Sequence, residues 1–353
     1  MWKSILQPLH PLRLPPPDSF HNQTILITGA NTGVGREAAR HALSLGASKI
    51  IMGVRSVEKG ERARADILST VPTATEPSLE VWHLDLSSFQ NVMAFVRRMR
   101  DYVEKPGNRL DTAIMNAGLA SGEWNKSPDG WEMHVQVNGL STALLSLELL
   151  PLLISSSSHG TSDHAKKNTR GQQTSPSRPH LVIVSSDVHQ GVIFPQRTKT
   201  NILAALNDRN QWEELQAKNV VERYGVSKLF NQWTNIEIAK LVPIDSQTGL
   251  EKVIVTSATP GFTQSELLTR ERPPFMLKLI QTLFARTPPH GAMAIIDAAV
   301  REDGHGKWLE NLKVTDPGYI VSSSEGQKIR EQAWKEILDV LKRVDPDLKL
   351  SYT

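Results

Sequence analysis

Short, largely apolar runs recur along the chain, and segments of helical periodicity separate most of them. Because nearly every position in these runs is apolar, they are typical of strands buried on both faces of a parallel sheet. The predicted strands are Thr24–Thr28, Lys49–Val54, Leu79–Leu84, Thr112–Met115, Leu181–Val184, Val253–Thr256 and a last one near Lys307–Leu309. The predicted helices are Gly35–Leu45, Val57–Leu68, Phe89–Tyr102, Val137–Ile154, Gly291–Val300 and Gln327–Leu341. This alternation predicts an α/β fold, a single doubly wound Rossmann-type domain with a parallel sheet of about seven strands flanked by helices on both faces.

No break in composition divides residues 22–341, so we assign them to one domain. Within it, residues 155–178 are rich in Ser, Gly and Lys and bury too little apolar surface to offset the entropy cost of ordering. We expect them to form a flexible surface insertion, with phosphorylation or partner docking as the alternative. Residues 342–353 form a charged C-terminal tail.

Residues 1–21 form an N-terminal extension that prolines interrupt repeatedly. A signal peptide needs an unbroken apolar stretch of about 7–15 residues and a membrane helix needs about 20. Neither pattern is found along the chain, so we expect no transmembrane segment and a cytoplasmic protein. The extension is expected to be an ordered or semi-ordered strap, with loose membrane contact through Trp2 and Leu6 as the alternative.

The composition excludes several classes of binding and catalysis. With 39% hydrophobic residues the 353-residue chain can bury a core, and its formal charge of +3 is too small to indicate a nucleic-acid binder. The chain has no cysteine, which excludes disulfides, thiol catalysis and thiolate metal sites. No cluster of His, Asp and Glu has the spacing of metal ligands, so no metal is expected.

A glycine-rich turn follows the first predicted strand and leads into a helix. Its glycines are Gly29, Gly33 and Gly35, with Val34 inside the turn. A pyrophosphate needs backbone N–H groups at close range, where a Cβ atom would obstruct it, and a helix N-terminus adds partial positive charge. The spacing is TGxxxGxG rather than GxGxxG. In this strand–turn–helix setting, the turn predicts a dinucleotide cofactor.

The end of the second strand indicates which dinucleotide. A carboxylate there would bind the ribose 2′-hydroxyl of NAD, whereas an arginine favours the 2′-phosphate of NADP. The chain has Val54 in that position, followed by Arg55. Arg36 and Lys59 are further basic candidates, although both could be ordinary solvated helix charges. We therefore expect NADP(H) rather than NAD.

Further motifs follow in a fixed order near the ends of the predicted strands. They are TGANTGVG (28–35), LDLSS (84–88), MNAG (115–118), DGWE (129–132), VN (137–138), IVSS (183–186), YGVSK (224–228) and PG (260–261). On these motifs, from about Asn22 to Leu341, the chain resembles the short-chain dehydrogenase/reductase superfamily. Within it, the resemblance is to retinol-dehydrogenase-like enzymes and fungal secondary-metabolite reductases.

Tyr224 and Lys228 are four residues apart, which on a helix places both side chains on one face. The pKa of a free tyrosine is about 10, and a neighbouring ammonium favours the phenolate and lowers that pKa. The resemblance implies that Tyr224 exchanges the proton with the substrate. It also implies that Lys228 activates Tyr224 and holds the nicotinamide ribose.

The resemblance assigns two further catalytic roles. By register, Ser186 hydrogen-bonds the substrate oxygen, while Ser185 is structural. Asn138 holds a water in a proton relay that reaches Lys228, and a role as a helix cap is compatible with this.

The remaining cofactor contacts also come from the resemblance. Asp85 contacts the adenine, with a capping carboxylate as the alternative. Ser265, or else Thr263, supplies a hydroxyl to the nicotinamide carboxamide. The small residues that let the backbone approach the cofactor after the fourth strand are Asn116, Ala117 and Gly118.

Two segments flank the expected substrate site, His189–Asn219 and Glu266–Pro289. The second is rich in Leu, Ile, Met and Phe, which suits either an apolar lid helix or packing in a core or homo-oligomer interface. An apolar lid indicates a lipophilic ketone, aldehyde or alcohol as the substrate. His189 either faces this pocket or is structural.

Three functions compete. The first is an NADP-dependent oxidoreductase acting on a carbonyl or alcohol. The second is a nucleotide-binding scaffold or a non-redox, cyclase-like protein of the same fold, but such a protein needs no proton donor like Tyr224. The third, a nucleotide-sugar epimerase, usually has TGxxGxxG and a larger C-terminal domain. The first function fits the motifs best.

Overall fold

The structure is a computed structural model that describes residues 10–72, 78–157, 166–167, 173–174, 178–216, 221–264 and 285–352. The bounds of the strands in its main sheet are β1 (Thr24–Thr28), β2 (Lys49–Val54), β3 (Leu79–His83), β4 (Thr112–Met115), β7 (His180–Val184), β8 (Ile254–Ala258), β9 (Trp308–Glu310) and β10 (Lys313–Thr315). The predicted bounds of β1, β2 and β4 are confirmed residue for residue. Those of the other predicted strands differ by one or two residues at an end.

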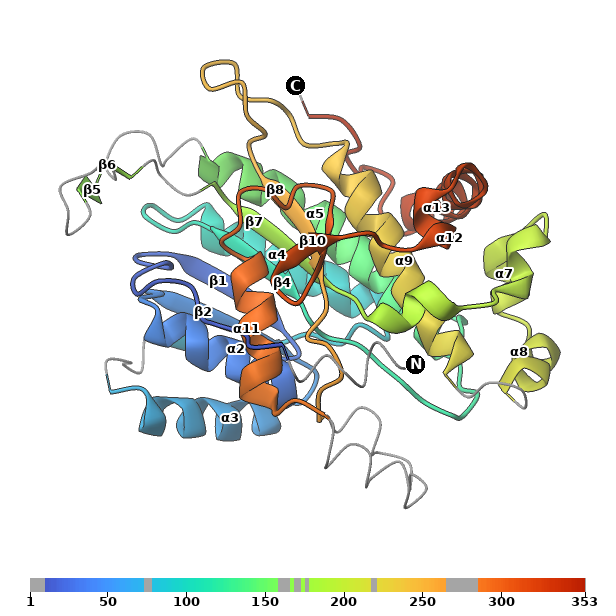
Figure 1. The fold of residues 1–353 in the computed structure, drawn as a ribbon, viewed down its shortest axis with the longest axis horizontal. Coiled ribbons are helices and arrows are strands. Elements are labelled where there is room, and N and C mark those ends of the chain that lie inside the picture. The colour runs from blue at the N-terminus through green and yellow to red at the C-terminus, as the bar shows by residue number, and fades with distance from the viewer. Residues whose placement is uncertain are drawn as a thin grey trace.

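The eight strands lie in the order β10-β9-β8-β7-β4-β1-β2-β3 (Figure 1). Neighbouring strands are parallel except for the edge pair β9 and β10. The predicted α/β Rossmann-type sheet of about seven parallel strands is therefore confirmed, with the antiparallel β10 as an addition. The strand order reverses between β1 and β4, and in such sheets ligands bind beyond the carboxyl ends of the strands at this point.

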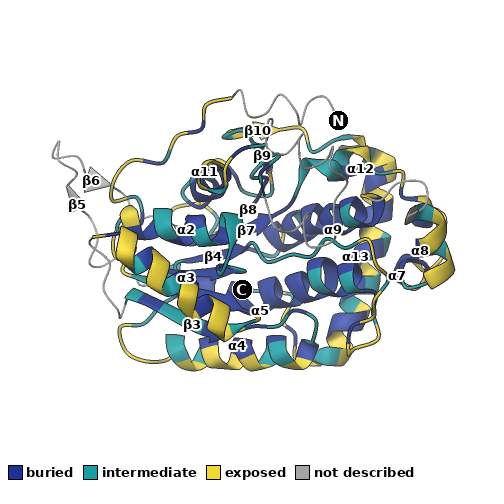
Figure 2. Ribbon diagram, turned by 90° about the horizontal axis from the view of Figure 1, so that it is seen from below, coloured by how far each residue is buried: buried dark blue, intermediate teal, exposed yellow. Residues whose placement is uncertain are grey.

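Helices cover both faces of the sheet. Those described are α2 (Gly33–Ser44), α3 (Val57–Thr70), α4 (Phe89–Val103), α5 (Thr142–Ser157), α7 (Ile202–Leu206), α8 (Arg209–Gln216), α9 (Glu222–Ala239), α11 (Pro288–Ala298), α12 (Tyr319–Ser322) and α13 (Ser324–Val344). A π-helix, η3 (Val135–Ser141), runs directly into α5. Figure 2 shows the exposed residues on the outer sides of α3, α4 and α8, with the buried strands between the helix layers.

Alternate residues of β1 divide the core into two halves. Ile25 and Ile27 pack with α2, α3 and α11, whereas Leu26 packs with α4, α5, α9 and α13. This is expected for a strand with helices on both faces, because successive side chains point to opposite sides. The fully apolar strands of the sequence thus bury both of their faces.

The segment Val135–Ser157 is long and apolar enough to cross a membrane by length and composition, but 83% of its apolar window is buried inside the protein. It packs between α4 and α9 as a core helix. No other helix in the described ranges meets the same length and hydropathy criteria.

The ends of the chain pack against the domain. Phe20 is fully buried, and its backbone N–H donates to the carbonyl oxygen of Leu45 at 3.0 Å, as expected for a strap. Trp2 and Leu6 lie outside the described residues. At the other end, Leu348 and Tyr352 pack against the half of the core that contains α4, α5, α9 and α13.

The predicted insertion 155–178 lies largely outside the described residues. Two short antiparallel strands within it are described, β5 (Lys166–Lys167) and β6 (Gln173–Thr174). They are not part of the main sheet. The flexibility of the insertion remains a prediction.

Candidate active site

The carboxyl ends of β1, β4, β7 and β8 lie side by side at one edge of the sheet. The predicted glycine turn follows β1, the Asn116–Gly118 segment follows β4, and Ser186 follows β7. Helix α9, which carries Tyr224 and Lys228, packs against β7 and β8. Parallel pairing therefore gathers motifs that are far apart in the sequence at a single edge.

The glycine turn after β1 is tightly packed on one side and open on the other. Gly29 has a left-handed φ of +68°, and a Cβ atom there would lie 2.9 Å from the Cα of Ala117. A Cβ atom at Gly35 would lie 2.4 Å from the carbonyl oxygen of Gly29. By contrast, the Cβ position of Gly33 has no described atom within 4 Å apart from its chain neighbours and the first turn of α2. The turn thus leaves space beside the N-terminus of α2, which fits a pyrophosphate.

Residues after β4 brace this turn from behind. The side-chain amide of Asn116 donates to the carbonyl oxygens of Thr28 at 3.0 Å and Gly29 at 3.4 Å. The backbone N–H of Ala117 donates to the hydroxyl of Thr28 at 2.9 Å. Val34 packs against the core formed with α2. Asn116 and Ala117 therefore fix the shape of the glycine turn through these contacts.

The basic residues near the end of β2 differ in whether their cations are paired with a carboxylate. Arg55 is exposed, and neither its guanidinium nor the Lys59 ammonium has a hydrogen bond or ion pair with another described residue. Arg36 forms ion pairs with Glu37 at 3.1 Å and Asp66 at 3.5 Å, which is the ordinary helix-charge arrangement. The exposed Arg55 and Lys59 are thus available to a 2′-phosphate.

Asp85 has the local hydrogen bonds expected of a capping carboxylate. It follows β3, next to the carboxyl end of β2, and its Oδ1 accepts hydrogen bonds from the backbone N–H and the hydroxyl of Ser87 at 2.9 and 2.8 Å. The carboxylate therefore forms a local turn ahead of α4. Its contact with an adenine remains a prediction.

The hydroxyl of Tyr224 is hydrogen-bonded to that of Ser186, so the two groups expected to meet the substrate oxygen lie together. Ser186 in turn donates to Oδ1 of Asp187 at 3.3 Å. We expected Lys228 to lower the pKa of Tyr224, but the net shift of that pKa is upward. Burial raises the pKa of Tyr224, and the negative charge of Asp187 raises it further. The phenol is held in its protonated form.

Lys228 lies beside the Tyr224 ring on α9. Its Nζ atom is 5.8 Å from the centre of the Tyr224 ring and donates to the carbonyl oxygen of Val184 at 3.0 Å. A Cβ atom at Gly118 would lie 3.3 Å from this Nζ and 3.3 Å from Oδ1 of Asn138. Gly118, Asn138 and Lys228 therefore meet at one point. Burial lowers the pKa of Lys228 to about 8.

Asn138 lies within the π-helix η3, a form that is frequent at functional sites. Its Oδ1 accepts from the backbone N–H of Leu119 at 2.8 Å, and its Nδ2 donates to the carbonyl oxygen of Leu119 at 2.8 Å. The second amide hydrogen reaches the hydroxyl of Ser227 at 2.8 Å. One lone pair of Oδ1 is left for a water. Asn138 thus joins the loop after β4 to helix α9.

Three neighbouring positions have structural contacts. Ser185 donates to the carbonyl oxygen of Lys228 at 2.7 Å. His189 is fully buried, and its ring nitrogens lie against the carbonyl oxygens of Ser186 and Pro317. Thr263 donates to the carbonyl oxygens of its own turn, at 3.1 and 3.2 Å. Of the two readings of His189, the structure supports the structural one.

Two predictions fall on residues without a description. Ser265 lies outside the described residues, as does most of the expected lid Glu266–Pro289. Their roles stay predictions.

The sequence interpretation missed several groups at the site. Asp187 directly follows a motif serine, and its position next to that serine was the available signal. Ser227 lies inside the YGVSK motif, and the sequence analysis gave it no role, although it accepts a hydrogen bond from Asn138. Arg286 is buried beside the PG turn, where its Nη1 donates to the carbonyl oxygen of Pro260 at 3.3 Å. Nothing in the sequence around Arg286 indicates this contact.

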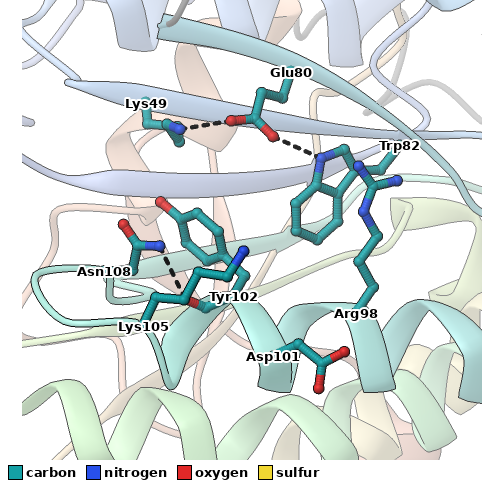
Figure 3. A pocket seen from close by; sticks show the side chains of 8 residues that line it. All are labelled: Lys49, Glu80, Trp82, Arg98, Asp101, Tyr102, Lys105 and Asn108. Atoms are coloured by element: carbon teal, nitrogen blue, oxygen red, sulfur yellow. Dashed lines mark hydrogen bonds and ion pairs between the residues drawn. The ribbon is translucent and has the colours of Figure 1, made fainter.

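A hollow of about 420 Å³ lies elsewhere, on β2, β3 and the C-terminal half of α4 (Figure 3). Lys49 and Glu80 stand near the starts of their strands, so the hollow is at the opposite edge of the sheet from Ser186. Its polar groups largely satisfy one another, since Glu80 accepts from Lys49 at 2.6 Å and from Trp82 at 2.9 Å. We do not assign the reaction to it. Its lining residues are Lys49, Glu80, Trp82, Arg98, Asp101, Tyr102, Lys105 and Asn108.

Comparison with known proteins gives consistent results. A family model described as short chain dehydrogenase matches residues 23–161. A short chain dehydrogenase/reductase of Cryptosporiopsis sp. (strain 8999) is 33% identical over 342 residues, covering 96% of each chain. A short-chain dehydrogenase/reductase of Aspergillus flavipes is 32% identical, covering 95% of this chain and 90% of that protein.

Solved structures share the fold at lower identity. An uncharacterised protein from Mycobacterium paratuberculosis has a TM-score of 0.59 and 22% identity, with 93% of this chain and 96% of that chain covered. A short chain dehydrogenase from Shigella flexneri 2a str. 301 complexed with NADP has a TM-score of 0.52 and 22% identity. That match covers 84% of this chain and 100% of the other.

Proposed function

This chain belongs to the short-chain dehydrogenase/reductase family, and from that premise we propose that it uses NADP(H) to interconvert a lipophilic ketone or aldehyde and its alcohol. Members of the family are NAD(P)-dependent oxidoreductases that act on small carbonyl and alcohol substrates. What is proposed for this chain is the preference for NADP(H), the lipophilic substrate class and the catalytic residues. A place in secondary metabolism is part of the same proposal and rests on the resemblance of the motifs.

One observation supports the proposal most directly, namely the paired hydroxyls of Tyr224 and Ser186 with Lys228 beside the Tyr224 ring. When bound, the cofactor supplies a hydride to the carbonyl carbon. The two hydroxyls bind the carbonyl oxygen, and Tyr224 donates its proton as negative charge develops there. The Lys228 ammonium stabilises the resulting phenolate, and a water beside Asn138 returns a proton from solvent. A protonated phenol, as burial and Asp187 favour here, suits the reduction direction.

Support for NADP(H) comes from Arg55 and Lys59 after β2, whose exposed cations have no partner among the residues that the structure describes. A 2′-phosphate carries negative charge that Arg55 can bind in a bidentate manner and Lys59 can attract as a point charge. No carboxylate occupies the end of β2 to bind a 2′-hydroxyl instead, because Val54 is the last residue of the strand. The open space at Gly33 fits the pyrophosphate of the same cofactor.

The test is a panel of lipophilic ketones and aldehydes assayed with NADPH and NADH in parallel. We expect NADPH to give at least about tenfold higher kcat/KM, because loss of a charge-assisted pair costs about 1.5–3 kcal/mol. Arg55→Ala should remove most of this preference by weakening NADPH alone. Glu58→Ala is the matched control, as an exposed residue close by on α3. An equal or better rate with NADH would contradict the cofactor proposal.

A further inference from the structure

A second polar cluster lies directly beside the proposed catalytic groups and has no part in the proton transfer. Glu132, His134 and Arg223 are 0%, 1% and 3% exposed. Nδ1 of His134 lies 2.7 Å from Oε1 of Glu132, which also accepts the backbone N–H of His134 at 3.1 Å. Arg223 precedes Tyr224 and is attracted to Glu132, but its guanidinium has no hydrogen-bond partner among the described residues. Such a buried charged group requires a reason.

The hydrogen bonds fix the form of the His134 ring. The backbone N–H of Ser121 donates to Nε2 of His134 at 3.1 Å, so this nitrogen carries a lone pair. The ring proton is therefore on Nδ1, from which it is donated to the Glu132 carboxylate. Burial opposes ionisation of Glu132, but the hydrogen bonds from His134 and the charge of Arg223 hold its pKa below the ordinary value. The carboxylate thus orients an imidazole that accepts from the loop.

The loop that His134 holds is the one that touches Lys228. The side chain of Asn138 is hydrogen-bonded to both the backbone N–H and the backbone carbonyl of Leu119. Two residues farther along the loop, the backbone N–H of Ser121 is bound by His134. The residue before Leu119, Gly118, faces Lys228, and a Cβ atom added at Gly118 would lie 3.3 Å from Nζ, closer than an ordinary contact. A small movement of this loop would therefore reach the ammonium group.

We propose that Glu132 and His134 are positioning residues for the reaction, which fasten the loop at Ser121 so that Gly118 and Asn138 keep Lys228 in place. Arg223 balances the buried charge of Glu132 from the helix that carries Tyr224. The proposal rests on the function proposed above. It assigns to the DGWE motif and the histidine after it a role in ordering the site, with no contact to substrate.

The test distinguishes the roles of the two ring nitrogens of His134, of which Nδ1 binds Glu132 and Nε2 binds Ser121. A glutamine amide can reach the place of Nε2, whereas an asparagine amide reaches only that of Nδ1. His134→Gln should therefore keep the bond to Ser121, and His134→Asn should lose it. His83→Asn, at an exposed histidine on β3, is the control for the substitution itself.

Amide hydrogen exchange of Ser121 gives a readout that does not need turnover. In His134→Asn we expect exchange about tenfold faster, with kcat lowered about tenfold and the KM for NADPH near that of wild type. His134→Gln should restore both exchange and kcat. If His134→Asn does not fold, Glu132→Gln is measured in its place, with the same direction expected. Unchanged exchange and kcat, or loss of both in His134→Gln as well, would overturn the proposal. Failure of the function itself would appear differently, as wild-type protein inactive on every carbonyl with Ser121 still protected.

Discussion

The ammonium group of Lys228 donates a hydrogen bond to the carbonyl oxygen of Val184, 3.0 Å away at the carboxyl end of β7. The side chain of Asn231 donates to the same oxygen, also at 3.0 Å. Lys228 is only 3% exposed, and its burial makes the charged form less favourable than in water. Lys228 therefore loses the positive charge that the site requires at a lower pH than a solvated lysine does.

This burial predicts an alkaline limit to activity. Because the pKa of Lys228 is lowered to about 8, the group loses its charge as the pH rises through about 8, well before a solvated lysine does. We expect the rate of carbonyl reduction to fall over that range, measured from about pH 6 to about pH 10. Lys228→Arg keeps its charge throughout, so its lower activity should show no such limb. The same limb in Lys228→Arg would assign it to another group.

Asp187 provides a second test through pH. Its negative charge raises the pKa of Tyr224, so Asp187→Asn should lower that pKa. Alcohol oxidation needs the phenolate, and its rise with pH should move to lower pH by about one unit, since a nearby like charge has effects of that order. Asp208→Asn, at the start of α8, is the control for loss of a carboxylate. A rise that stays in place, or moves to higher pH, would show that Asp187 does not act on Tyr224.

The fold and the chemical groups could be predicted from sequence because both depend on local pattern. Apolar runs mark β1, β2 and β4, and the four-residue spacing places Tyr224 and Lys228 on one helix face. What could not be predicted depends on contacts between distant segments. Asn138 lies in a π-helix, and it is hydrogen-bonded to Leu119, which is 19 residues earlier in the chain. The direction of the Tyr224 pKa shift follows from burial, which spacing does not reveal.

A carboxyl group away from the site predicts how stability depends on pH. Glu148 on α5 is 3% exposed and shares a hydrogen bond with Asp345, the residue directly after α13. Arg100 forms an ion pair with Glu148. Burial and the carboxyl neighbour raise the pKa of Glu148 to about 7. The folded protein therefore binds this proton more tightly than the unfolded chain does.

The stabilisation from Glu148 is complete below its ordinary pKa of 4.5 and is lost as the pH rises through about 7. It amounts to about 3–4 kcal/mol at most, since one pKa unit corresponds to about 1.4 kcal/mol. We expect Glu148→Gln to flatten the fall of the unfolding free energy over this range, measured by denaturant titration. Glu331→Gln, on the exposed side of α13, is the control. An unchanged slope in Glu148→Gln would show that the pair does not share a proton.

The account depends most directly on the phenol of Tyr224 as the proton donor. We expect Tyr224→Phe to bind NADPH as wild type does and to lower the rate of carbonyl reduction about 10²–10⁴-fold, the usual contribution of a positioned acid. Tyr319→Phe, at a tyrosine that is 73% exposed, should leave the rate unchanged. A Tyr224→Phe protein that binds NADPH and reduces the same carbonyl at close to the wild-type rate would contradict the account.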